Sequence, residues 1–416
     1  MKPSRGAAIE LFASDTGRSA DAVTADAPGW RVGLTRLVLT DFRNYRRASL
    51  SLATDPVVLT GPNGAGKTNL LEAVSFLAPG RGLRGAKLTE IDRRSAPSEN
   101  AQEAADRGWA VAADVAVRHG ALRIGTGRER AAGDRRIVRI DGEPARSQAL
   151  LGERLGVVWL TPAMDRLFLD GPGGRRRFLD RLVLVLDPAH AARVGAYEQA
   201  LRERSQLLRA GVSGDRPADP GWLSALEAVM AAQGVAVAAA RRDAVERLDR
   251  ACAAADGPFP RAGFGLLGVV EEWLDQMPAL AAEARFAAAL AAARRGDAAA
   301  GGAAIGPHRS DLAVSLAQSG IAAAGASTGE QKALLISILL AHAGLQRALR
   351  GEPPLLLLDE VAAHLDASRR EALFEAIGRL SSQAWLTGTD AALFASLRSR
   401  AQFFSVHSGT LATTAF

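Results

Sequence analysis

The sequence predicts an α/β fold in which a mixed sheet and a small antiparallel sheet are split by an inserted compact helical lobe. Apolar and alternating runs between residues 34 and 60 lead into a glycine-rich loop at residues 61–68. From Gly173 the apolar residues take the period of helices, and buried-strand patterns return at residues 355–358 and 384–387. The chain has 416 residues, enough for two or three compact units.

The pattern of residues 34–140 predicts several strands and one helix. Residues 34–60 predict three strands, the last of them buried, and residues 69–78 have the apolar spacing of a helix. Residues 92–107 are polar and predict a loop, whereas residues 109–140 alternate as in a small antiparallel sheet. Residues 1–29 have no continuous apolar core, so they predict a flexible tail and not a secretory signal.

The middle of the chain is predicted to be helical. A Gly- and Pro-containing break at residues 211–221 interrupts the heptads that a long coiled coil needs, so the lobe should be compact and not an extended arm. The predicted helices cover residues 175–186, 190–210, 222–255 and 280–295. The predicted divisions are a tail at 1–29, a first α/β part at 30–172, the helical lobe at 173–300 and a second α/β part at 301–416.

Composition excludes some classes of protein. The net charge is +6, but only four of the 51 basic residues are lysines, which indicates codon bias toward arginine more than a nucleic-acid partner. The single cysteine, Cys252, excludes an internal disulfide framework and a multi-cysteine zinc site. Near-apolar stretches such as Ala333 to Leu345 fall short of the roughly 18 residues of a membrane span. We expect a cytoplasmic protein with no membrane partner.

A complete phosphate-binding motif, the P-loop at residues 61–68, lies between a predicted strand and a predicted helix. Such glycines let backbone N–H groups surround an anion at a helix N-terminus. In this motif Lys67 reaches the β- and γ-phosphates of ATP, and the Thr68 hydroxyl binds Mg²⁺. The predicted nucleotide-binding residues here are Gly61, Pro62, Asn63, Gly64, Ala65, Gly66, Lys67, Thr68 and Asn69.

Two carboxylates follow the apolar strand at residues 355–358. Asp359 comes at the carboxyl edge of that strand, where we expect it to hold Mg²⁺. Glu360 points differently and can orient and deprotonate an attacking water. The predicted catalytic residues are therefore Glu360, Lys67 and Asp359.

A second candidate phosphate cap lies upstream of that strand. Ser327 and Gly329 precede an apolar helix, and a Ser at such a position is either an ordinary N-cap or a phosphate-binding cap. One ATP site cannot use two caps at opposite ends of one protomer, which predicts a two-fold dimer with each cap closing on the partner's nucleotide. Asp366 can act at the dimer seam, cap the next helix, or both, and His364 is expected to be structural.

With these motifs in this order the chain resembles the ABC/SMC-type ATPase heads, and more specifically the RecF family of recombination mediators. The resemblance rests on the segment Phe42-Arg43-Asn44-Tyr45, on the P-loop, on Gly171 to Arg181, on Gly306 to Arg309 and on Leu357 to Asp366. It implies a P-loop ABC-type ATPase head that dimerises on ATP, binds single-stranded and duplex DNA at gaps, and works with RecR and RecO in loading recombinase. It also implies slow, DNA-stimulated ATP hydrolysis, a role in the SOS response, and a place for Arg43 near the phosphates.

The chain departs from the family pattern at three positions. The cap segment that begins at Ser327 corresponds to the signature motif of these ATPases, and Thr328 replaces a glycine of that motif. Ser310 stands where the family usually has an acid. Where transporter ATPases carry a switch histidine this chain has the run Leu386 to Asp390, in which Thr389 could sense the phosphate only by a hydrogen bond. These departures favour weak trans contacts and slow turnover.

DNA contact is predicted for the arginines Arg175, Arg176, Arg177 and Arg181, and for Arg135, Arg136 and Arg139 of the small sheet. Such contacts would be salt-dependent and largely independent of sequence. The alternative is an internal ion-pair network with Asp170 or Asp180. Two other functions stay open: a transporter ATPase subunit, which the wide separation of Lys67 from Ser327 disfavours, and an ATP-gated DNA scaffold with incidental hydrolysis.

Overall fold

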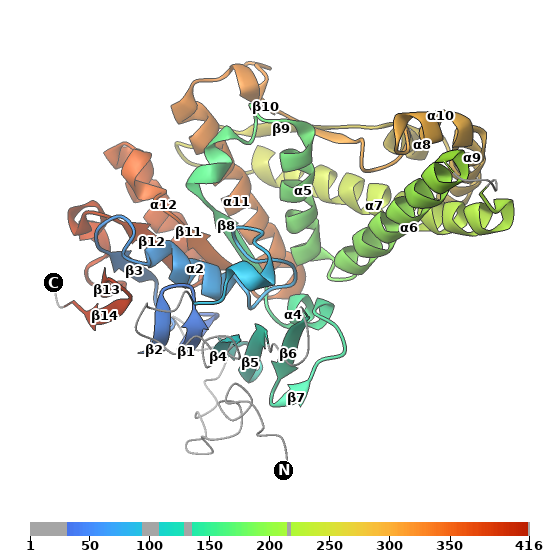
Figure 1. Ribbon diagram of the computed structural model, residues 1–416. Coiled ribbons are helices and arrows are strands. Elements are labelled where there is room, and N and C mark those ends of the chain that lie inside the picture. Colours follow the sequence, from blue (N-terminus) through green and yellow to red (C-terminus); the bar gives the residue numbers. More distant parts are fainter. Residues whose placement is uncertain (1–30, 94–107, 129–134, 214–217, 415–416) are drawn as a thin grey trace, which may run out of the picture. The chain divides into compact units, whose positions relative to one another are not determined.

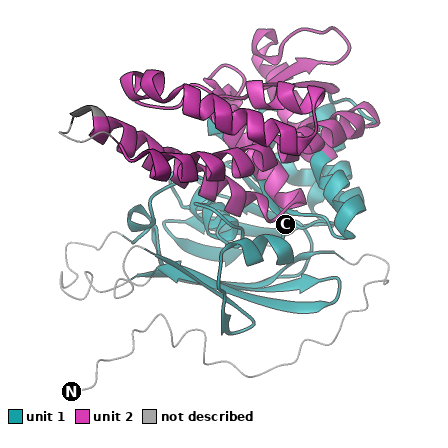
Figure 2. Cartoon of the chain, turned by 90° about the vertical axis from the view of Figure 1, so that its right-hand side faces the viewer, with its two compact units in different colours: residues 1–164, 256–259, 342–416 teal, residues 165–255, 260–341 magenta. Residues whose placement is uncertain are grey.

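The computed structural model describes residues 31–93, 108–128, 135–213 and 218–414. The predicted tail at 1–29, most of the predicted loop at 92–107 and the centre of the break at 211–221 lie outside these residues. The chain separates into two compact units, coloured in Figure 2: unit 1 is residues 1–164, 256–259 and 342–416, and unit 2 is residues 165–255 and 260–341. Unit 2 thus begins before the lobe predicted at 173–300 and extends beyond its predicted end.

A mixed six-stranded sheet in unit 1 carries the glycine-rich loop and the pair Asp359–Glu360 at the ends of its strands (Figure 1). Its apolar four-residue strands β3 and β11 are buried throughout, which explains why their sequences do not alternate. Five neighbouring strands are parallel, and only the terminal strand β14 is antiparallel. The strand order is β14 (Thr410–Thr413), β13 (Gln402–His407), β3 (Val57–Thr60), β12 (Ala384–Gly388), β11 (Leu355–Leu358) and β8 (Val157–Leu160).

The second sheet of unit 1 is antiparallel and packs against helix α2 (Lys67–Ser75). Phe42 and Trp109 from this sheet stack edge-to-face at 5.5 Å, and the ring of Phe76 at the end of α2 lies 5.0 Å from that of Trp109. This contact fixes the helix that follows the glycine-rich loop. The sheet order is β2 (Tyr45–Ser51), β1 (Gly33–Phe42), β4 (Trp109–Val117), β5 (Gly120–Arg128), β6 (Arg136–Ile140) and β7 (Glu143–Pro144).

Unit 2 is helical around its own apolar core. Its core includes Met230 and Phe286, neither of which is exposed. The side chain of Arg204 is also fully buried, and it pairs with Glu227 at 2.9 Å and Asp297 at 2.7 Å. The α-helices that lie wholly within this unit are α5 (Pro172–Leu186), α6 (His190–Ser213), α7 (Pro220–Ala253), α8 (Val269–Gln276), α9 (Ala279–Ala292) and α10 (Arg294–Ala300), and the first part of α11 (Thr328–Arg350) also belongs to it.

The predicted α/β class is confirmed, and the structure adds elements that the sequence pattern did not predict. Strand β8 joins the mixed sheet beside β11, and strands β9 (Ala262–Leu267) and β10 (Asp311–Leu316) pair across helices α8 to α10. Their partners are distant in sequence, so no local turn signal marks them. Short helix α4 (Ala149–Arg154), 3-10 helix η1 (Leu88–Glu90) and helices α11 (Thr328–Arg350) and α12 (Ala367–Leu380) complete the elements used below.

Within the part of the chain that the structure describes, helices α7 and α11 are long and apolar enough to cross a membrane by length and composition alone. This differs from the expectation from sequence, which rested on the shorter stretch at 333–345. About half of the apolar window of α7 and 61% of that of α11 are buried inside the fold. Both therefore serve as core helices here, and Cys252 is buried on α7.

Candidate functional site

The predicted glycine-rich loop follows directly from buried strand β3. Gly61, Gly64 and Gly66 have φ of 149°, 79° and 118°, a region that side chains rarely adopt. A Cβ on Gly61 would lie 2.2 Å from the carbonyl oxygen of Val406, and one on Gly66 would lie 2.6 Å from Nδ2 of Asn44. Both positions therefore require glycine. Pro62, Asn63 and Gly64 form the exposed tip of the loop.

Lys67 opens helix α2 with its side chain folded over the loop. Its Nζ donates to the carbonyl oxygens of Gly61 at 2.7 Å and Pro62 at 3.0 Å, and only 4% of the residue is exposed. Burial lowers the pKa of this ammonium, and the nearby carboxylates of Glu360 and Asp359 oppose that shift. The lysine is thus placed to exchange loop carbonyls for phosphate oxygens.

Thr68, Asp359 and Thr387 meet at the carboxyl edge of the mixed sheet. Oδ1 of Asp359 accepts hydrogen bonds from Thr387 Oγ1 at 2.8 Å and Thr68 Oγ1 at 3.1 Å. Burial raises the pKa of Asp359, and both hydroxyls oppose the rise because they stabilise the charged form. Strand β12 lies between β3 and β11, which is why its last residues reach both motifs.

Thr387 is not among the residues that the sequence predicts for the site. The sequence pattern favours Thr389, which is exposed two residues later, whereas Thr387 is 1% exposed. The backbone N–H of Glu360 donates to the Thr387 hydroxyl at 2.8 Å, so one side chain holds both acidic residues. A threonine at the end of an apolar strand next to the Asp-Glu strand is the signal that could have identified it.

Glu360 leaves the sheet in a left-handed turn. Its φ is 54°, so the chain turns sharply directly after Asp359. The residue is partly exposed, while Asp359 is buried. The two carboxylates therefore occupy different environments, as separate roles in metal binding and water activation require.

The donor set fits Mg²⁺ and a nucleotide triphosphate. Among the described residues no group of three or more His, Cys, Asp or Glu side chains is placed to hold a metal. A hydroxyl and a carboxylate at the end of a phosphate-binding loop instead match the way Mg²⁺ is held, by few protein oxygens together with water and phosphate. Thr68 and Asp359 are the residues that would hold it.

Thr387→Val is expected to shift the acid limb of nucleotide hydrolysis at this candidate site to higher pH. The substitution removes a hydrogen bond to ionised Asp359, so the pKa of that carboxyl rises further and protonation begins at a higher pH. At pH values above the acid limb the variant should approach the parental activity, because the carboxyl is then ionised in both proteins. Thr387→Ser keeps the hydroxyl and should keep the parental pH profile; a parental profile in Thr387→Val would show that Thr387 does not tune Asp359.

The turn that contains Arg43 packs on the glycine-rich loop. Nδ2 of Asn44 donates to the carbonyl oxygen of Ala65 at 3.2 Å, and Tyr45 Oη donates to that of Gly66 at 3.0 Å. Asn69, in the first turn of α2, donates to Oδ1 of Asn44 at 2.7 Å. These contacts support the shape of the loop from the side of the antiparallel sheet.

Arg43 itself is engaged with a buried carboxylate. It pairs with Glu72 of α2 through two hydrogen bonds of 2.8 and 2.7 Å, and Arg84 pairs with the same carboxylate at 2.8 Å. Its Nη1 also donates to the carbonyl oxygen of Glu90. Contact of Arg43 with phosphate, which the family resemblance implies, stays a prediction.

The signature residues lie at the start of α11. Ser327, Thr328 and Gly329 are exposed. Glu330 forms a capping box: its carboxylate accepts from the backbone N–H of Ser327 at 2.9 Å, and the Ser327 hydroxyl accepts from the N–H of Glu330 at 3.3 Å. Asp366 caps α12 by accepting from the N–H of Arg369 at 2.8 Å, and it is exposed.

The predicted DNA-contacting arginines of unit 2 have different environments. Arg175 forms two hydrogen bonds to Asp311, at 2.7 and 2.8 Å, and Arg176 donates to the carbonyl oxygen of Ser310 at 2.7 Å. Burial lowers the pKa of Arg181 to about 9, and its guanidinium lies 5.4 Å from the Phe178 ring. Arg177 is exposed.

The arginine segment and the segment Gly306 to Arg309 form one polar cluster inside unit 2. Arg241 of α7 joins them, because it pairs with Asp180 at 2.8 Å and donates to the carbonyl oxygen of Pro307 at 2.6 Å. His308 Nδ1 lies 2.6 Å from the Tyr197 hydroxyl. The alternative of an internal network thus applies to Arg175 and Arg176, which are both bonded within the unit. The sequence did not predict Asp311 as the partner of Arg175.

Comparison with known proteins gives an assignment by sequence. Residues 33–411 match the family model for the RecF/RecN/SMC N-terminal domain. The chain is 48% identical over 387 residues to the DNA replication and repair protein RecF of Mesorhizobium japonicum, covering 92% of this chain and 98% of that protein. It is 49% identical over 380 residues to RecF of a Caulobacter species, covering 89% and 95%.

Solved structures agree with the fold. The recombination mediator protein RecF-ATPrS of the RecFOR pathway superposes with a TM-score of 0.79 at 20% identity, covering 92% of this chain and 99% of that one. The corresponding RecF-ATP structure gives a TM-score of 0.77, covering 94% and 100%. The Smc head domain of Pyrococcus furiosus gives 0.50 at 14% identity. At these identities the likeness concerns the fold alone.

Proposed function

This chain belongs to the RecF family of DNA replication and repair proteins, and from that premise we propose that it is an ATP-dependent DNA-binding dimer of recombinational repair. One observation carries the proposal most directly: Thr387 joins Thr68, Asp359 and Glu360 at the edge of a single sheet, next to Lys67. That arrangement supports binding and slow hydrolysis of ATP with Mg²⁺.

The chemistry follows from the side chains around the glycine-rich loop. When bound, Mg²⁺ would supply positive charge that offsets the negative charge of the phosphates. Thr68 Oγ1 and Asp359 Oδ1 would hold it, and Lys67 Nζ would leave its loop carbonyls to bind phosphate oxygens. The Glu360 carboxylate would orient the attacking water and accept its proton.

Dimer formation is proposed through the exposed start of α11. Because Ser327, Thr328 and Gly329 are exposed, a partner's phosphates can reach the helix N-terminus. The Glu330 carboxylate now accepts from the Ser327 N–H, and it would have to leave before a phosphate could bind there. Because the partner's phosphate would have to replace the Glu330 carboxylate, we expect a weak contact between each cap and the partner's nucleotide, and therefore slow turnover.

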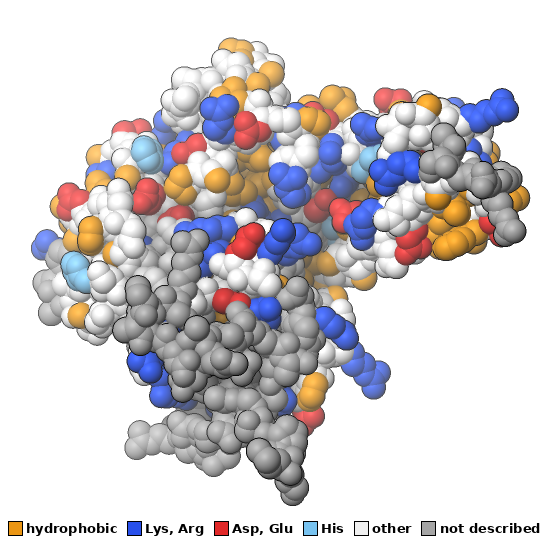
Figure 3. All heavy atoms as spheres, viewed as in Figure 1, with side chains coloured by type: hydrophobic (Ala, Val, Ile, Leu, Met, Phe, Trp, Pro, Cys, Tyr) orange, Lys and Arg blue, Asp and Glu red, His pale blue; other side chains and the backbone are white. Residues whose placement is uncertain are grey.

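Sequence-independent DNA binding is proposed for exposed arginines. Figure 3 shows, on the face in view, basic side chains scattered among acidic and apolar ones, so net charge alone does not identify the contact. Arg177→Gln is expected to weaken duplex DNA binding and to lower the salt slope by about 0.9, the value for one phosphate contact. Fluorescence anisotropy at several salt concentrations measures both.

Arg175→Gln is the matched variant for that experiment. Because Arg175 pairs with Asp311, its loss should lower the melting temperature and leave the salt slope of DNA binding unchanged. An unchanged slope in Arg177→Gln, or the same fall in slope in both variants, would remove Arg177 from the DNA-binding residues.

Further properties are proposed from the family alone: partnership with RecR and RecO, a role in the SOS response, and a cytoplasmic location. The competing function as a transporter subunit lacks support, because positions 67 and 327 are far apart and no switch histidine follows β12. The scaffold hypothesis differs from the proposal only in whether hydrolysis matters.

Sedimentation analysis tests the proposal as a whole. The protein should sediment as a monomer alone and as a dimer with ATP and Mg²⁺, and with duplex DNA it should form a larger complex that dissociates at high salt. A sedimentation coefficient that stays the same when ATP and DNA are added would contradict the proposed function.

A further inference from the structure

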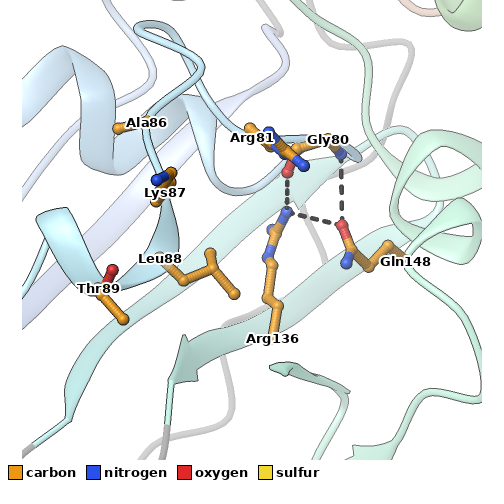
Figure 4. A pocket seen from close by; sticks show the side chains of 8 residues that line it. All are labelled: Gly80, Arg81, Ala86, Lys87, Leu88, Thr89, Arg136 and Gln148. Atoms are coloured by element: carbon orange, nitrogen blue, oxygen red, sulfur yellow. Dashed lines mark hydrogen bonds between the residues drawn. The ribbon is translucent and has the colours of Figure 1, made fainter. Parts of the chain in front are cut away.

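We propose that a cavity of unit 1 at the C-terminal end of α2 binds a phosphodiester group of a DNA strand. The cavity measures about 570 Å³ and is shown in Figure 4. The inference rests on the proposed DNA-binding function, but it concerns residues outside the predicted contacts. The lining residues used below are Gly80, Arg81, Lys87, Thr89, Arg136 and Gln148.

Arg136 builds one wall of the cavity and is not itself available as a ligand. Its guanidinium donates to the carbonyl oxygens of Phe76, Ala78 and Gly80, and its Nε donates to Thr126. Burial lowers its pKa to about 9. Although Arg136 is predicted from sequence to contact DNA, its donors are used inside the protein.

Arg136 makes the turn that follows α2 suitable for an anion. Free carbonyl oxygens carry partial negative charge, which would repel a phosphate. Here the arginine cation donates to carbonyl oxygens of that turn, at 2.8 Å for Gly80 and 3.2 Å for Ala78. These carbonyls are therefore already bonded to a cation, and Figure 4 shows Gly80 and Gln148 held against the same guanidinium.

Two other cations line the cavity and remain open to solvent. Arg81 and Lys87 are exposed, and neither has a carboxylate within ion-pair distance among the residues that the structure describes. None of the residues that line the cavity is acidic. By contrast, neighbouring Arg84 and Arg43 both pair with Glu72. The Glu90 carboxylate accepts from the backbone N–H of Lys87 at 3.2 Å but forms no ion pair with its ammonium, so the side chains that line the cavity keep a net positive charge.

The donors that line the cavity fit a phosphate group. Arg81 can give two parallel hydrogen bonds to phosphate oxygens, and Lys87 adds a compact point charge. The Thr89 hydroxyl and the Gln148 amide supply neutral donors on other sides. Because Arg81, Lys87 and Thr89 are exposed, a strand can pass the opening with one phosphate inserted, which favours a polymer over an enclosed small molecule.

Acetylation of lysines in the unmodified protein tests the site. The chain has only four lysines, and Lys67 and Lys332 are buried, so Lys87 can be followed by mass spectrometry with an added free lysine peptide as the reference. Saturating duplex DNA should slow acetylation of Lys87 at least severalfold relative to that peptide, whereas inorganic phosphate at an equal phosphate concentration should not. Equal rates with and without DNA, or equal protection by inorganic phosphate, would overturn the proposal.

Paired variants separate this site from DNA binding in general. Arg81→Gln/Lys87→Gln should lower the salt slope of duplex binding by about 0.9 for each phosphate that the protein no longer neutralises. Arg46→Gln/Arg47→Gln makes the same charge change at exposed positions of β2 and should leave the slope unchanged. An equal fall in both variants would indicate only a general field effect and no site. No DNA binding by the parent protein would instead refute the proposed function, and with it the inference.

Discussion

Glu360→Gln should reduce ATP hydrolysis by about 10²-fold or more and leave ATP binding intact, because general-base catalysis contributes on that order. The amide keeps the shape of the carboxylate but cannot accept the proton of the attacking water. The backbone N–H of Glu360, which is bonded to Thr387, is unaffected by the change. We therefore expect a stable ATP-bound dimer that stays on DNA longer than the parent protein.

Steady-state phosphate release and dissociation of the protein from labelled duplex measure these two effects. Glu371→Gln, an exposed position of α12, provides the same chemical change away from the site. Parental hydrolysis by Glu360→Gln would show that another group activates the water. Slow hydrolysis with unchanged DNA dissociation would favour the scaffold hypothesis, in which ATP binding acts and its hydrolysis is incidental.

Lys67→Met should abolish ATP-dependent dimerisation. The ammonium would form two charge-assisted hydrogen bonds to phosphate oxygens, each about 1.5–3 kcal/mol, which corresponds to a loss of roughly 10² to 10⁴-fold in ATP affinity. Titration calorimetry and sedimentation with ATP measure the loss. An ATP-dependent sedimentation shift equal to that of the parent would contradict the dimer with shared nucleotide sites.

Lys67→Arg tests whether geometry matters as well as charge. The planar guanidinium cannot fold over the loop as the flexible lysine does when it bonds Gly61 and Pro62. We expect it to lose ATP binding although the charge remains. Melting temperatures close to the parental value without nucleotide would show that neither variant acts through unfolding.

The sequence identified much of the site because contiguous motifs carry it. The glycines of the loop, Lys67 and Thr68 are close in sequence, and the buried strand before Asp359 is visible as an apolar run. These features depend on local backbone geometry, which short segments encode. Thr387 escaped prediction because its role depends on β12 lying between β3 and β11.

The arginines between residues 175 and 181 show what the sequence could not predict. Four arginines within seven positions gave one prediction of DNA contact, yet Arg175 is held by Asp311, which follows 136 positions later. Arg136 likewise donates to a carbonyl oxygen of the turn that follows α2, a role that its own strand does not reveal. Whether a cation is exposed or paired depends on distant partners.

What the sequence by itself determined is the α/β class, the loop that curls around an anion, and the carboxylates at a strand end. Each follows from the preferences of neighbouring residues, above all the freedom of glycine at positive φ and the burial of apolar strands. Only the tertiary structure decided that Thr387 links Asp359 to Glu360 and which arginines remain exposed. Strand pairing joins residues hundreds of positions apart, and an ion pair such as Arg175–Asp311 joins residues more than a hundred positions apart. A local sequence pattern does not show which of these residues will pair.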